Sequence, residues 1–336
     1  MTNPTASAPR FRVHLESRRA QSAHFHLTPE VWAEAGAAQP ALAARLDPSF
    51  GWDGERLPEA LSDADFLIAG KFDMGIVGAA PRLSWIHTPS AGVDALMPLD
   101  DLRADLVLTN SSGVHATKAG DYAAMALLML NARMPELIDA QRDGRWIEAL
   151  TAPIHGKTVV VIGFGDIGQA VGWAALSLGL EVVAVTRSGV AAPRAPAVRV
   201  VATSGLDALL PDADFVVVTA PLTAQTRGLL NRERLFALRP TAGLVNLARA
   251  ALVDYDALAT RLRDGALCGA VLDVFATEPL PADSPWWRVP RLVVTPHVSC
   301  DPPDYGRRVL DLWFANFARR VAGEALHNRV DRERGY

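Results

Sequence analysis

The sequence predicts an α/β protein of two lobes, each with a parallel β-sheet wound by helices. Three observations favour this class. Short apolar runs alternate with helical stretches along most of the 336 residues, as in βα units. The segment SDADFLIAG at 62–70 is similar to PDADFVVVTA at 211–220, so both halves place acidic residues before a buried strand. A long helical stretch at 114–145 lies between the halves and is interpreted as their connection.

In the first half, a strand is expected at 11–15, followed by a helix with Thr28 as its N-cap and Pro29 in its first turn. The apolar spacing of 114–145 predicts one long helix that bends near Pro135. Further short strands, each a buried apolar run, are expected at 65–69, 84–87 and 106–109.

In the second half, Asp254 is expected to cap a helix that ends before Gly265. The stretch 304–322 is helical in pattern and is expected to return to the first lobe. Strands are expected at seven apolar runs, namely 159–162, 181–185, 198–201, 215–219, 244–247, 270–274 and 292–295.

A glycine-rich turn joins the first two of these strands through a helix. The run 159–162 is followed by Gly163, Gly165 and Gly168, then by an alanine-rich helical segment. Gly163 can take a tight turn, Gly165 has no side chain to keep a pyrophosphate from the backbone, and Gly168 lets the helix pack closely on its strand. Because the helix N-terminus then presents N–H groups to phosphates, this spacing predicts dinucleotide binding.

Composition excludes several classes of function. The net charge is −4 with both signs interspersed, which disfavours a nucleic-acid or membrane partner. The two cysteines are too few for a disulfide framework, so a reducing cytoplasm is expected. Residues 1–10 are expected to form a loose polar leader, and the apolar stretch 122–132 is too short to cross a bilayer. His24 and His26 have no third partner in the sequence, so no metal is expected.

Three polar residues follow apolar strands of the second half. They are Arg249, Glu278 and His297. Residues just beyond the carboxyl ends of parallel strands line the ligand crevice of such sheets. A guanidinium can bind a carboxylate, a histidine can transfer a proton near neutral pH, and a carboxylate can orient that histidine. Singly, each residue is also compatible with a solvated loop or an ordinary ion pair, but together they predict a catalytic group.

These residues lie in motifs that resemble the D-isomer-specific 2-hydroxyacid dehydrogenases. The first half contributes a thinner match, SAGVD at 90–94. The stronger matches follow one another through the second half: GFGDIG at 163–168, APLTAQTRGLLN at 220–231, VNLARAALVD at 245–254, LDVFATEPLP at 272–281 and TPHVS at 295–299.

The resemblance implies a role for each matching residue. His297 would be the acid/base, Glu278 its partner and Arg249 the cation that orients the substrate. Backbone amides of the loop Ala91, Gly92 and Val93 would hold the substrate carboxylate. Asp273 would face the nicotinamide amide. The remaining cofactor contacts would fall at Gly163, Phe164, Gly165, Asp166, Ile167, Gly168, Pro221, Thr226, Leu247 and Ala248.

The end of the strand 181–185 bears on cofactor choice. NAD-using proteins place an acidic residue there to bind the ribose 2′-OH. This chain has Thr186, Arg187 and Ser188, so NADPH is expected, with NADH as the weaker cofactor. Arg187 could pair with a 2′-phosphate and the two hydroxyls could donate to it, with help from Arg194 in the next loop.

The resemblance also implies the architecture and the reaction. A Rossmann-type cofactor domain at 114–297 would be inserted into a flavodoxin-like substrate domain at 1–113 and 298–336, both doubly wound, with the active site in the cleft between them. A cytoplasmic homodimer that reduces glyoxylate or hydroxypyruvate to the D-2-hydroxy acid is the main interpretation. A phosphite-type dehydrogenase and a dinucleotide-sensing, corepressor-like binding protein remain alternatives. Asp121 and Ala250 depart from the usual glutamate and glycine of the family, and the roles of Trp286 and Trp287 stay open.

Overall fold

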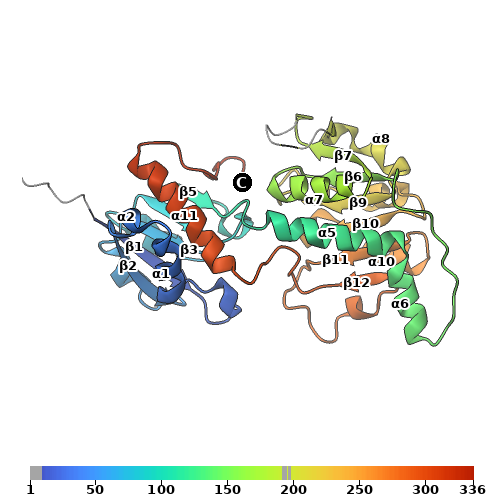
Figure 1. Ribbon diagram of the computed structural model, residues 1–336, viewed down its shortest axis with the longest axis horizontal. Coiled ribbons are helices and arrows are strands. Elements are labelled where there is room, and N and C mark those ends of the chain that lie inside the picture. Colours follow the sequence, from blue (N-terminus) through green and yellow to red (C-terminus); the bar gives the residue numbers. More distant parts are fainter. Residues whose placement is uncertain (1–9, 191–194, 196–197) are drawn as a thin grey trace, which may run out of the picture. The chain divides into compact units, whose positions relative to one another are not determined.

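The computed structural model describes residues 10–190, 195 and 198–336 (Figure 1). Most of the expected leader, residues 1–9, and Arg194 lie outside the described residues. The chain divides into two compact units, unit 1 (Met1–Val114 and Pro302–Tyr336) and unit 2 (His115–Asp301). The division falls one residue beyond the expected end at 113 and four beyond that at 297.

Unit 1 contains a five-stranded parallel sheet in the order β2-β1-β3-β4-β5, which is the flavodoxin-like order that was predicted. Its strands are β1 (Phe11–Ser17), β2 (Leu46–Trp52), β3 (Phe66–Ala69), β4 (Trp85–Thr88) and β5 (Val107–Asn110). Its α-helices are α1 (Pro29–Ala37), α2 (Pro40–Ala43), α3 (Leu57–Leu61), α4 (Met74–Ala79) and α11 (Tyr305–Val321), with 3-10 turns η1 (Ala23–Phe25) and η2 (Asp94–Leu96).

Two apolar clusters cover the two faces of this sheet. One packs α3 and α4 on the sheet through residues such as Leu57, Leu61 and Val77. The other is aromatic and brings α11 from the end of the chain onto the first strands. There the rings of Trp313 and Trp85 stack with centroids 5.1 Å apart. The last helix is therefore part of the core of unit 1.

Most predicted elements of unit 1 are confirmed, including the N-cap, where Thr28 Oγ1 accepts from the Val31 amide at 3.4 Å. Strand β2 was missed. Its sequence, LDPSFGW, contains Pro48 and Gly51, which disfavour a central strand. Because β2 pairs only with β1, at the edge of the sheet, both residues are tolerated there.

Unit 2 contains a seven-stranded parallel sheet in the order β12-β11-β10-β9-β6-β7-β8. The order reverses between β6 and β9, as in Rossmann folds, and ligands bind at such a point, beyond the carboxyl ends of the strands. The strands are β6 (Thr158–Ile162), β7 (Glu181–Thr186), β8 (Arg199–Ala202), β9 (Phe215–Val218), β10 (Gly243–Asn246), β11 (Gly269–Leu272) and β12 (Leu292–Val294).

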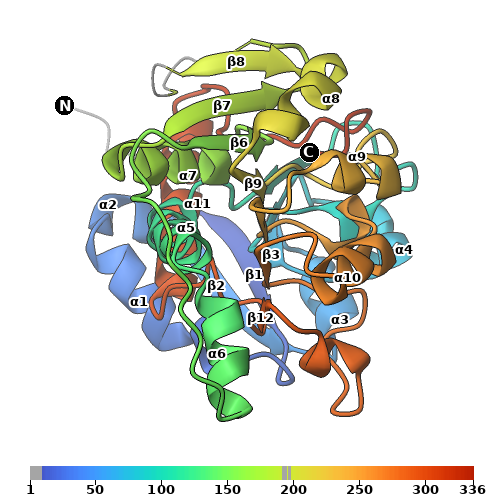
Figure 2. The same ribbon diagram turned by 90° about the vertical axis from the view of Figure 1, so that its right-hand side faces the viewer.

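Helices cover both faces of this sheet (Figure 2). On one face lie α5 (Ala116–Asn131), α6 (Met134–Arg142) and α7 (Asp166–Ser177). On the other lie α8 (Leu206–Leu209), α9 (Arg232–Ala237) and α10 (Tyr255–Arg263). The described part of the unit also has four 3-10 turns: η3 (Thr203–Gly205), η4 (Leu210–Asp212), η5 (Ala250–Leu252) and η6 (Pro285–Arg288).

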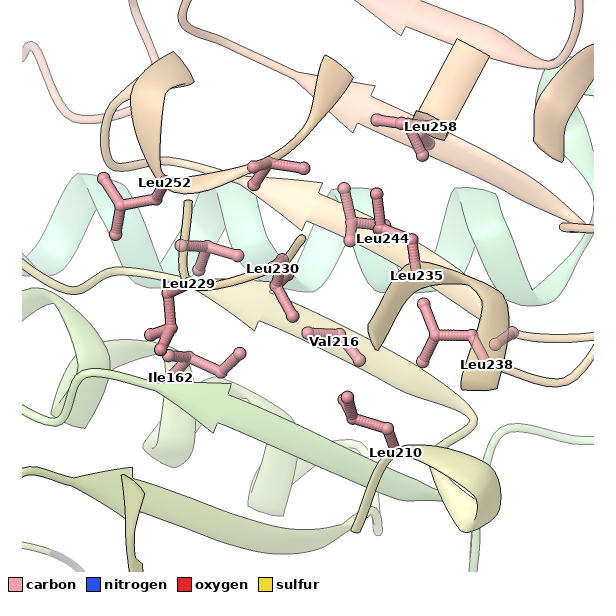
Figure 3. Close-up of a cluster of buried hydrophobic side chains, with 14 of the residues drawn as sticks. Ile162, Leu210, Val216, Leu229, Leu230, Leu235, Leu238, Leu244, Leu252 and Leu258 are labelled. Atoms are coloured by element: carbon pink, nitrogen blue, oxygen red, sulfur yellow. The ribbon is translucent and has the colours of Figure 1, made fainter. Parts of the chain in front are cut away.

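Alternate strand residues supply the two cores of unit 2. Figure 3 shows one of them, in which Ile162, Val216 and Leu244 of the strands pack against leucines from the covering helices and loops. The neighbouring residues Val161, Val217 and Val245 point to the other face and pack against α5 and α7. The near-continuous apolar runs in the sequence reflect this double burial.

The long helix expected at 114–145 is two helices. The chain leaves α5 at Asn131, and Arg133 has a positive φ of 53°, which ends the helical path before α6 begins at Met134. Pro135 stands in the first turn of α6, where its missing N–H costs no hydrogen bond. The Asp254 cap is confirmed, with Oδ1 accepting from the Ala257 amide at 3.0 Å. Among the described residues, no helix combines the length and apolarity needed to span a membrane.

Candidate active site

The glycine turn between β6 and α7 has the geometry that a dinucleotide requires. Gly163 has a φ of +89°, and a Cβ on it would lie 2.5 Å from Ala220. A Cβ on Gly168 would lie 2.1 Å from the Gly163 carbonyl oxygen, so the helix packs directly on the turn. A Cβ on Gly165 would meet nothing within 4 Å, which leaves open space over the start of α7. The turn therefore fits a pyrophosphate held by backbone amides.

A second loop, after β9, is tied to this turn. Thr219 Oγ1 donates to the Gly163 carbonyl at 2.6 Å. Further along, Thr226 Oγ1 donates to the Pro221 carbonyl at 2.7 Å and accepts from the Thr223 amide at 2.8 Å. Pro221 and Thr226 were singled out from the sequence, whereas Thr219 was missed because its role depends on a partner 56 residues away.

The end of β7 forms a tight turn around Thr186. Its hydroxyl accepts from the Gly189 amide at 3.0 Å and donates to the Val190 carbonyl at 3.3 Å. Thr186 therefore shapes the turn in this structure, and its contact with the cofactor stays a prediction. The side chains of Arg187 and Ser188 are exposed at the same turn.

Arg249 follows β10 and is fixed through its backbone. The fully buried Asn246 donates from Nδ2 to the Arg249 carbonyl at 3.1 Å and accepts from the Ala248 amide at 3.0 Å. Tyr255 supports Asn246, since its hydroxyl accepts from Asn246 at 3.1 Å and donates to the Val274 carbonyl at 2.7 Å. Leu247 and Ala248, between strand and arginine, are buried.

Glu278 and His297 form a hydrogen-bonded pair, with Nδ1 of the histidine 2.7 Å from Oε2 of the glutamate. The other glutamate oxygen accepts from the Phe275 amide at 2.8 Å. The bond to Glu278 raises the pKa of His297, against the opposing effect of partial burial. Partial burial by itself would raise the pKa of Glu278. The hydrogen bonds from His297 and Phe275 outweigh this effect, so the pKa of Glu278 is lowered. The pair therefore favours an imidazolium beside a carboxylate, and Arg249 is near enough to act electrostatically on both groups.

Asp273 anchors the segment that carries His297. The buried carboxylate accepts at Oδ1 from Thr295 Oγ1 at 2.6 Å and from the Val298 amide at 3.0 Å. Its Oδ2 accepts from the Ser299 amide at 2.9 Å. His297, between these contacts, has a φ of 55°, in the left-handed region. A contact with a nicotinamide amide stays a prediction for Asp273, whereas its bonds to the residues on both sides of His297 were not predicted.

Two residues of α5 and its N-cap bond to the two ends of the segment 295–300, which contains His297. Tyr122 shares a 2.6 Å hydrogen bond with Thr295, and burial raises the pKa of Tyr122 to about 12, so its hydroxyl keeps its proton. His115 donates from Nδ1 to the Cys300 carbonyl at 3.1 Å. Burial lowers the pKa of His115, which favours its neutral form. These residues are seven apart, so they stand on one face of the helix.

The substrate loop expected at Ala91, Gly92 and Val93 belongs to unit 1, where it follows β4. Val93 is buried, and Ala91 and Gly92 are half-buried. Arg249, Glu278 and His297 all belong to unit 2. The structure thus brings the three charged residues together at the carboxyl ends of β10, β11 and β12.

The other histidines, tryptophans and cysteines singled out from the sequence make packing or hydrogen-bond contacts or are buried thiols. His26 Nε2 lies 2.9 Å from the Gln21 carbonyl, and no group of three or more potential metal ligands occurs among the described residues. Trp286 packs against Tyr255 with ring centroids 5.1 Å apart, while Trp287 is half exposed and donates to the Pro281 carbonyl. Both cysteines are free thiols, and burial raises the pKa of Cys268 and of Cys300 to about 11.

Known proteins resemble the chain in sequence and in structure. Residues 124–299 match the family described as D-isomer specific 2-hydroxyacid dehydrogenase, NAD binding domain. A glyoxylate reductase of Thermococcus onnurineus is 32% identical over 296 residues, which cover 83% of this chain and 86% of the relative. A glyoxylate/hydroxypyruvate reductase B of Pectobacterium carotovorum is 32% identical over 306 residues, covering 86% and 94% of the two chains.

Two solved structures are similar over nearly their whole length. A D-isomer specific 2-hydroxyacid dehydrogenase of Xanthobacter autotrophicus, in complex with NADPH and MES, has a TM-score of 0.82 at 32% identity and covers 98% of this chain and 100% of that one. An NADPH-dependent glyoxylate/hydroxypyruvate reductase of Sinorhizobium meliloti, in complex with NADP and sulfate, has a TM-score of 0.80 at 25% identity and covers 97% and 100%.

Proposed function

Because the chain belongs to the D-isomer-specific 2-hydroxyacid dehydrogenase family, we propose that it reduces a short 2-oxo acid to the D-2-hydroxy acid, with NADPH preferred. The family makes it an NAD(P)-dependent oxidoreductase. Glyoxylate and hydroxypyruvate, named in the relatives, are the first substrates proposed. The observation that carries the proposal is the 2.7 Å pair of His297 and Glu278 beside Arg249.

The bound cofactor would supply a hydride to the keto carbon. His297 has the geometry of a proton donor, since Glu278 occupies Nδ1 and leaves Nε2 as the nitrogen that can protonate the developing alkoxide. Arg249 would bind the substrate carboxylate and stabilise the alkoxide charge. The amides at Ala91 to Val93 are proposed as the second carboxylate contact.

The alternatives are less well supported. Phosphite oxidation and dinucleotide sensing without turnover are both compatible with the fold. Relatives named glyoxylate reductase, together with all three catalytic residue types, favour 2-oxo acid reduction. The deciding experiment measures kcat/KM for glyoxylate, hydroxypyruvate and pyruvate with NADPH, and phosphite oxidation with NADP⁺. Phosphite turnover alone, or tight NADPH binding with no turnover of any substrate, would replace the proposal with one of the alternatives.

NADPH preference is proposed from Arg187 and Ser188, which are exposed at the turn after β7, where no acidic residue stands. The variant Arg187→Ala should lose roughly 10- to 150-fold in kcat/KM with NADPH relative to NADH, the loss expected for one charge-assisted bond. Arg199→Ala, which removes an exposed arginine from the start of β8, is the matched control. Equal or better use of NADH by the unmodified enzyme contradicts the preference.

A homodimer is proposed from the exposed apolar side chains of unit 2. Six of them lie on α5, α6, α7 and the segment 143–153: Met125, Leu128, Met134, Trp146, Leu150 and Trp173. Trp146 is 95% exposed, and exposed apolar surface of this extent is typical of association surfaces. Sedimentation equilibrium should give a dimer that Leu128→Glu weakens and Phe236→Glu, on α9, does not. A monomer at micromolar concentration contradicts the homodimer.

We also propose a cytoplasmic location, because both cysteines are free thiols.

A further inference from the structure

The loop Pro89–Val93 of unit 1 is held by three hydrogen bonds to consecutive carbonyl groups. The Tyr305 hydroxyl, from α11, donates to the carbonyl of Pro89. The Ser111 amide donates to the carbonyl of Ser90 at 3.1 Å. Asn110 Nδ2 donates to the carbonyl of Ala91 at 2.8 Å. The donors come from the end of β5 and from the first turn of α11. Parts of the chain about 200 residues apart therefore both bind this loop.

These contacts set the direction of the loop amides. In a trans peptide the N–H points opposite to the C=O of the same plane. Since the carbonyls of Ser90 and Ala91 point to β5, the amides of Ala91 and Gly92 point away from it. Neither amide has a hydrogen-bond acceptor within the described part of the chain. Two neighbouring N–H groups with the same direction form an anion-binding concavity.

Asn110 can act in only one orientation. It is 6% exposed, and its Oδ1 accepts from the Ser112 amide at 3.1 Å while Nδ2 faces Ala91. A flipped amide would place oxygen against the Ala91 carbonyl and nitrogen against an N–H group. From the end of the chain, Asn328 donates to the carbonyl of Ser112 at 2.7 Å and fixes the backbone beneath. The side chain of Asn110 is therefore preorganised.

A buried hydrogen-bond network supports the neighbouring Ser111. Trp85 Nε1 donates to Thr109 Oγ1, which shares a 2.8 Å hydrogen bond with His87 Nδ1. His87 Nε2 shares a 3.0 Å hydrogen bond with Ser111 Oγ, which also lies 3.0 Å from the carbonyl oxygen of Thr88. These bonds join the ends of β4 and β5 beneath the loop.

We propose that Asn110 is a positioning residue that orients the Gly92 amide toward the carboxylate of the substrate, beside the Ala91 amide that the Ser111 bond orients. Asn110 does not touch the substrate in this proposal and acts through the Ala91–Gly92 peptide. The inference rests on the proposed function, because a carboxylate substrate is what these amides would receive. It extends that function by assigning the specificity for a charged 2-oxo acid partly to unit 1.

The test compares Asn110→Ala with Asn316→Ala. Asn316 is also buried and also makes one accepted and one donated bond to backbone, but both of these bonds are to His327, away from the loop. Asn110→Ala should raise KM for glyoxylate roughly 10-fold, the loss expected for one hydrogen bond, with little change in KM for NADPH. For methylglyoxal, an uncharged 2-oxo aldehyde, KM should stay within about twofold. The control should raise neither KM.

A second variant covers the case in which Asn110→Ala does not fold. Tyr305→Phe removes only the hydroxyl that holds Pro89 and should shift the glyoxylate KM in the same direction by a smaller factor. Equal changes for glyoxylate and methylglyoxal, or the same rise in Asn316→Ala, would overturn the proposal. Calorimetric binding of oxamate in the presence of NADP⁺ gives a readout without turnover. If the unmodified protein turns over no 2-oxo acid, the proposed function fails, whereas an oxamate affinity that Asn110→Ala leaves unchanged overturns the positioning role.

Discussion

Two histidines at strand ends, His87 in unit 1 and His297 in unit 2, show how neighbours decide what one residue type does. His87 is fully buried between the hydroxyls of Thr109 and Ser111, and burial lowers its pKa to about 3. His297 is partly exposed and bonded to a carboxylate, and that bond raises its pKa. The first is neutral and structural. The second favours the charged form that can donate a proton.

A histidine near the carboxyl end of a strand is therefore not by itself a sign of catalysis. Both residues follow or end apolar runs, and both rings are hydrogen-bonded to a neighbouring side chain. The difference lies in the partner. Burial removes the hydration of an imidazolium, and the neutral hydroxyls around His87 do not compensate for that loss. The negative charge of Glu278 does compensate for it at His297. Four substitutions separate the two roles.

The largest effect is expected for His297. Because its φ is 55°, asparagine, which tolerates the left-handed region, is a better replacement than alanine. His297→Asn should lower kcat for reduction by on the order of 10²-fold or more, through loss of the proton donor. NADPH affinity and the free energy of unfolding should change little. Steady-state kinetics and urea unfolding check both, and near-normal turnover would remove His297 from the mechanism.

His87 should affect stability with a specific pH dependence. Its pKa is about 3 when folded and close to 6.5 when unfolded, so protonation favours the unfolded state between these values. Its contribution is complete above pH 6.5 and falls by about 1.4 kcal/mol per pH unit below it. His87→Gln keeps a donor and an acceptor but cannot titrate. The stability lost between pH 6.5 and 5 should therefore be about 2 kcal/mol smaller in this variant than in the unmodified protein.

Urea unfolding at a series of pH values measures that difference. His155→Gln, at an exposed histidine of unit 2, is the control and should follow the unmodified protein. Parallel curves for the unmodified protein and His87→Gln would show that His87 is not held neutral by the fold.

Glu278→Gln should move the pH profile of reduction. The carboxylate raises the pKa of His297, so its loss lowers that pKa and the imidazolium disappears at lower pH. Activity should fall on the alkaline side by roughly tenfold per unit of pKa change and be retained at lower pH. The pH dependence of kcat/KM checks this. An unchanged alkaline limb would mean that the pair seen in the structure does not control the proton donor.

The smallest effect is expected at the support of the His297 segment. Tyr122→Phe removes the bond to Thr295, but Asp273 keeps its bonds to Thr295, Val298 and Ser299. Turnover should fall by about threefold or less, the effect of one neutral hydrogen bond. A loss as large as that of His297→Asn would show that α5, and not Asp273, is the main support.

Much of the fold could be predicted because parallel strands buried on both faces are continuous apolar runs. Strand β2 could not, since a proline and a glycine are tolerated at an edge by pairing that local sequence does not reveal. The end of α5 depends on the left-handed backbone at Arg133, a residue type with no preference for it.

The charged residues of the site could be predicted from their motifs, but their supports could not. Tyr122 and Thr295 are 173 residues apart, and His115 and Cys300 are 185 apart. Such pairs have no local pattern in a single sequence. The hydrogen bonds of Thr186 within its turn, to Gly189 and Val190, were likewise not predicted, and its cofactor contact stays a prediction.

The two thiols have a practical consequence for chemical modification. With a pKa of about 11, the fraction of each cysteine that is thiolate at pH 8 is only on the order of 10⁻³. The thiolate is the reactive form. Maleimides and alkylating agents should therefore leave both native cysteines largely intact. A single thiol introduced by Ser188→Cys, at the exposed turn after β7, would react selectively. A fluorophore could then be attached beside the proposed 2′-phosphate contact without first removing Cys268 or Cys300.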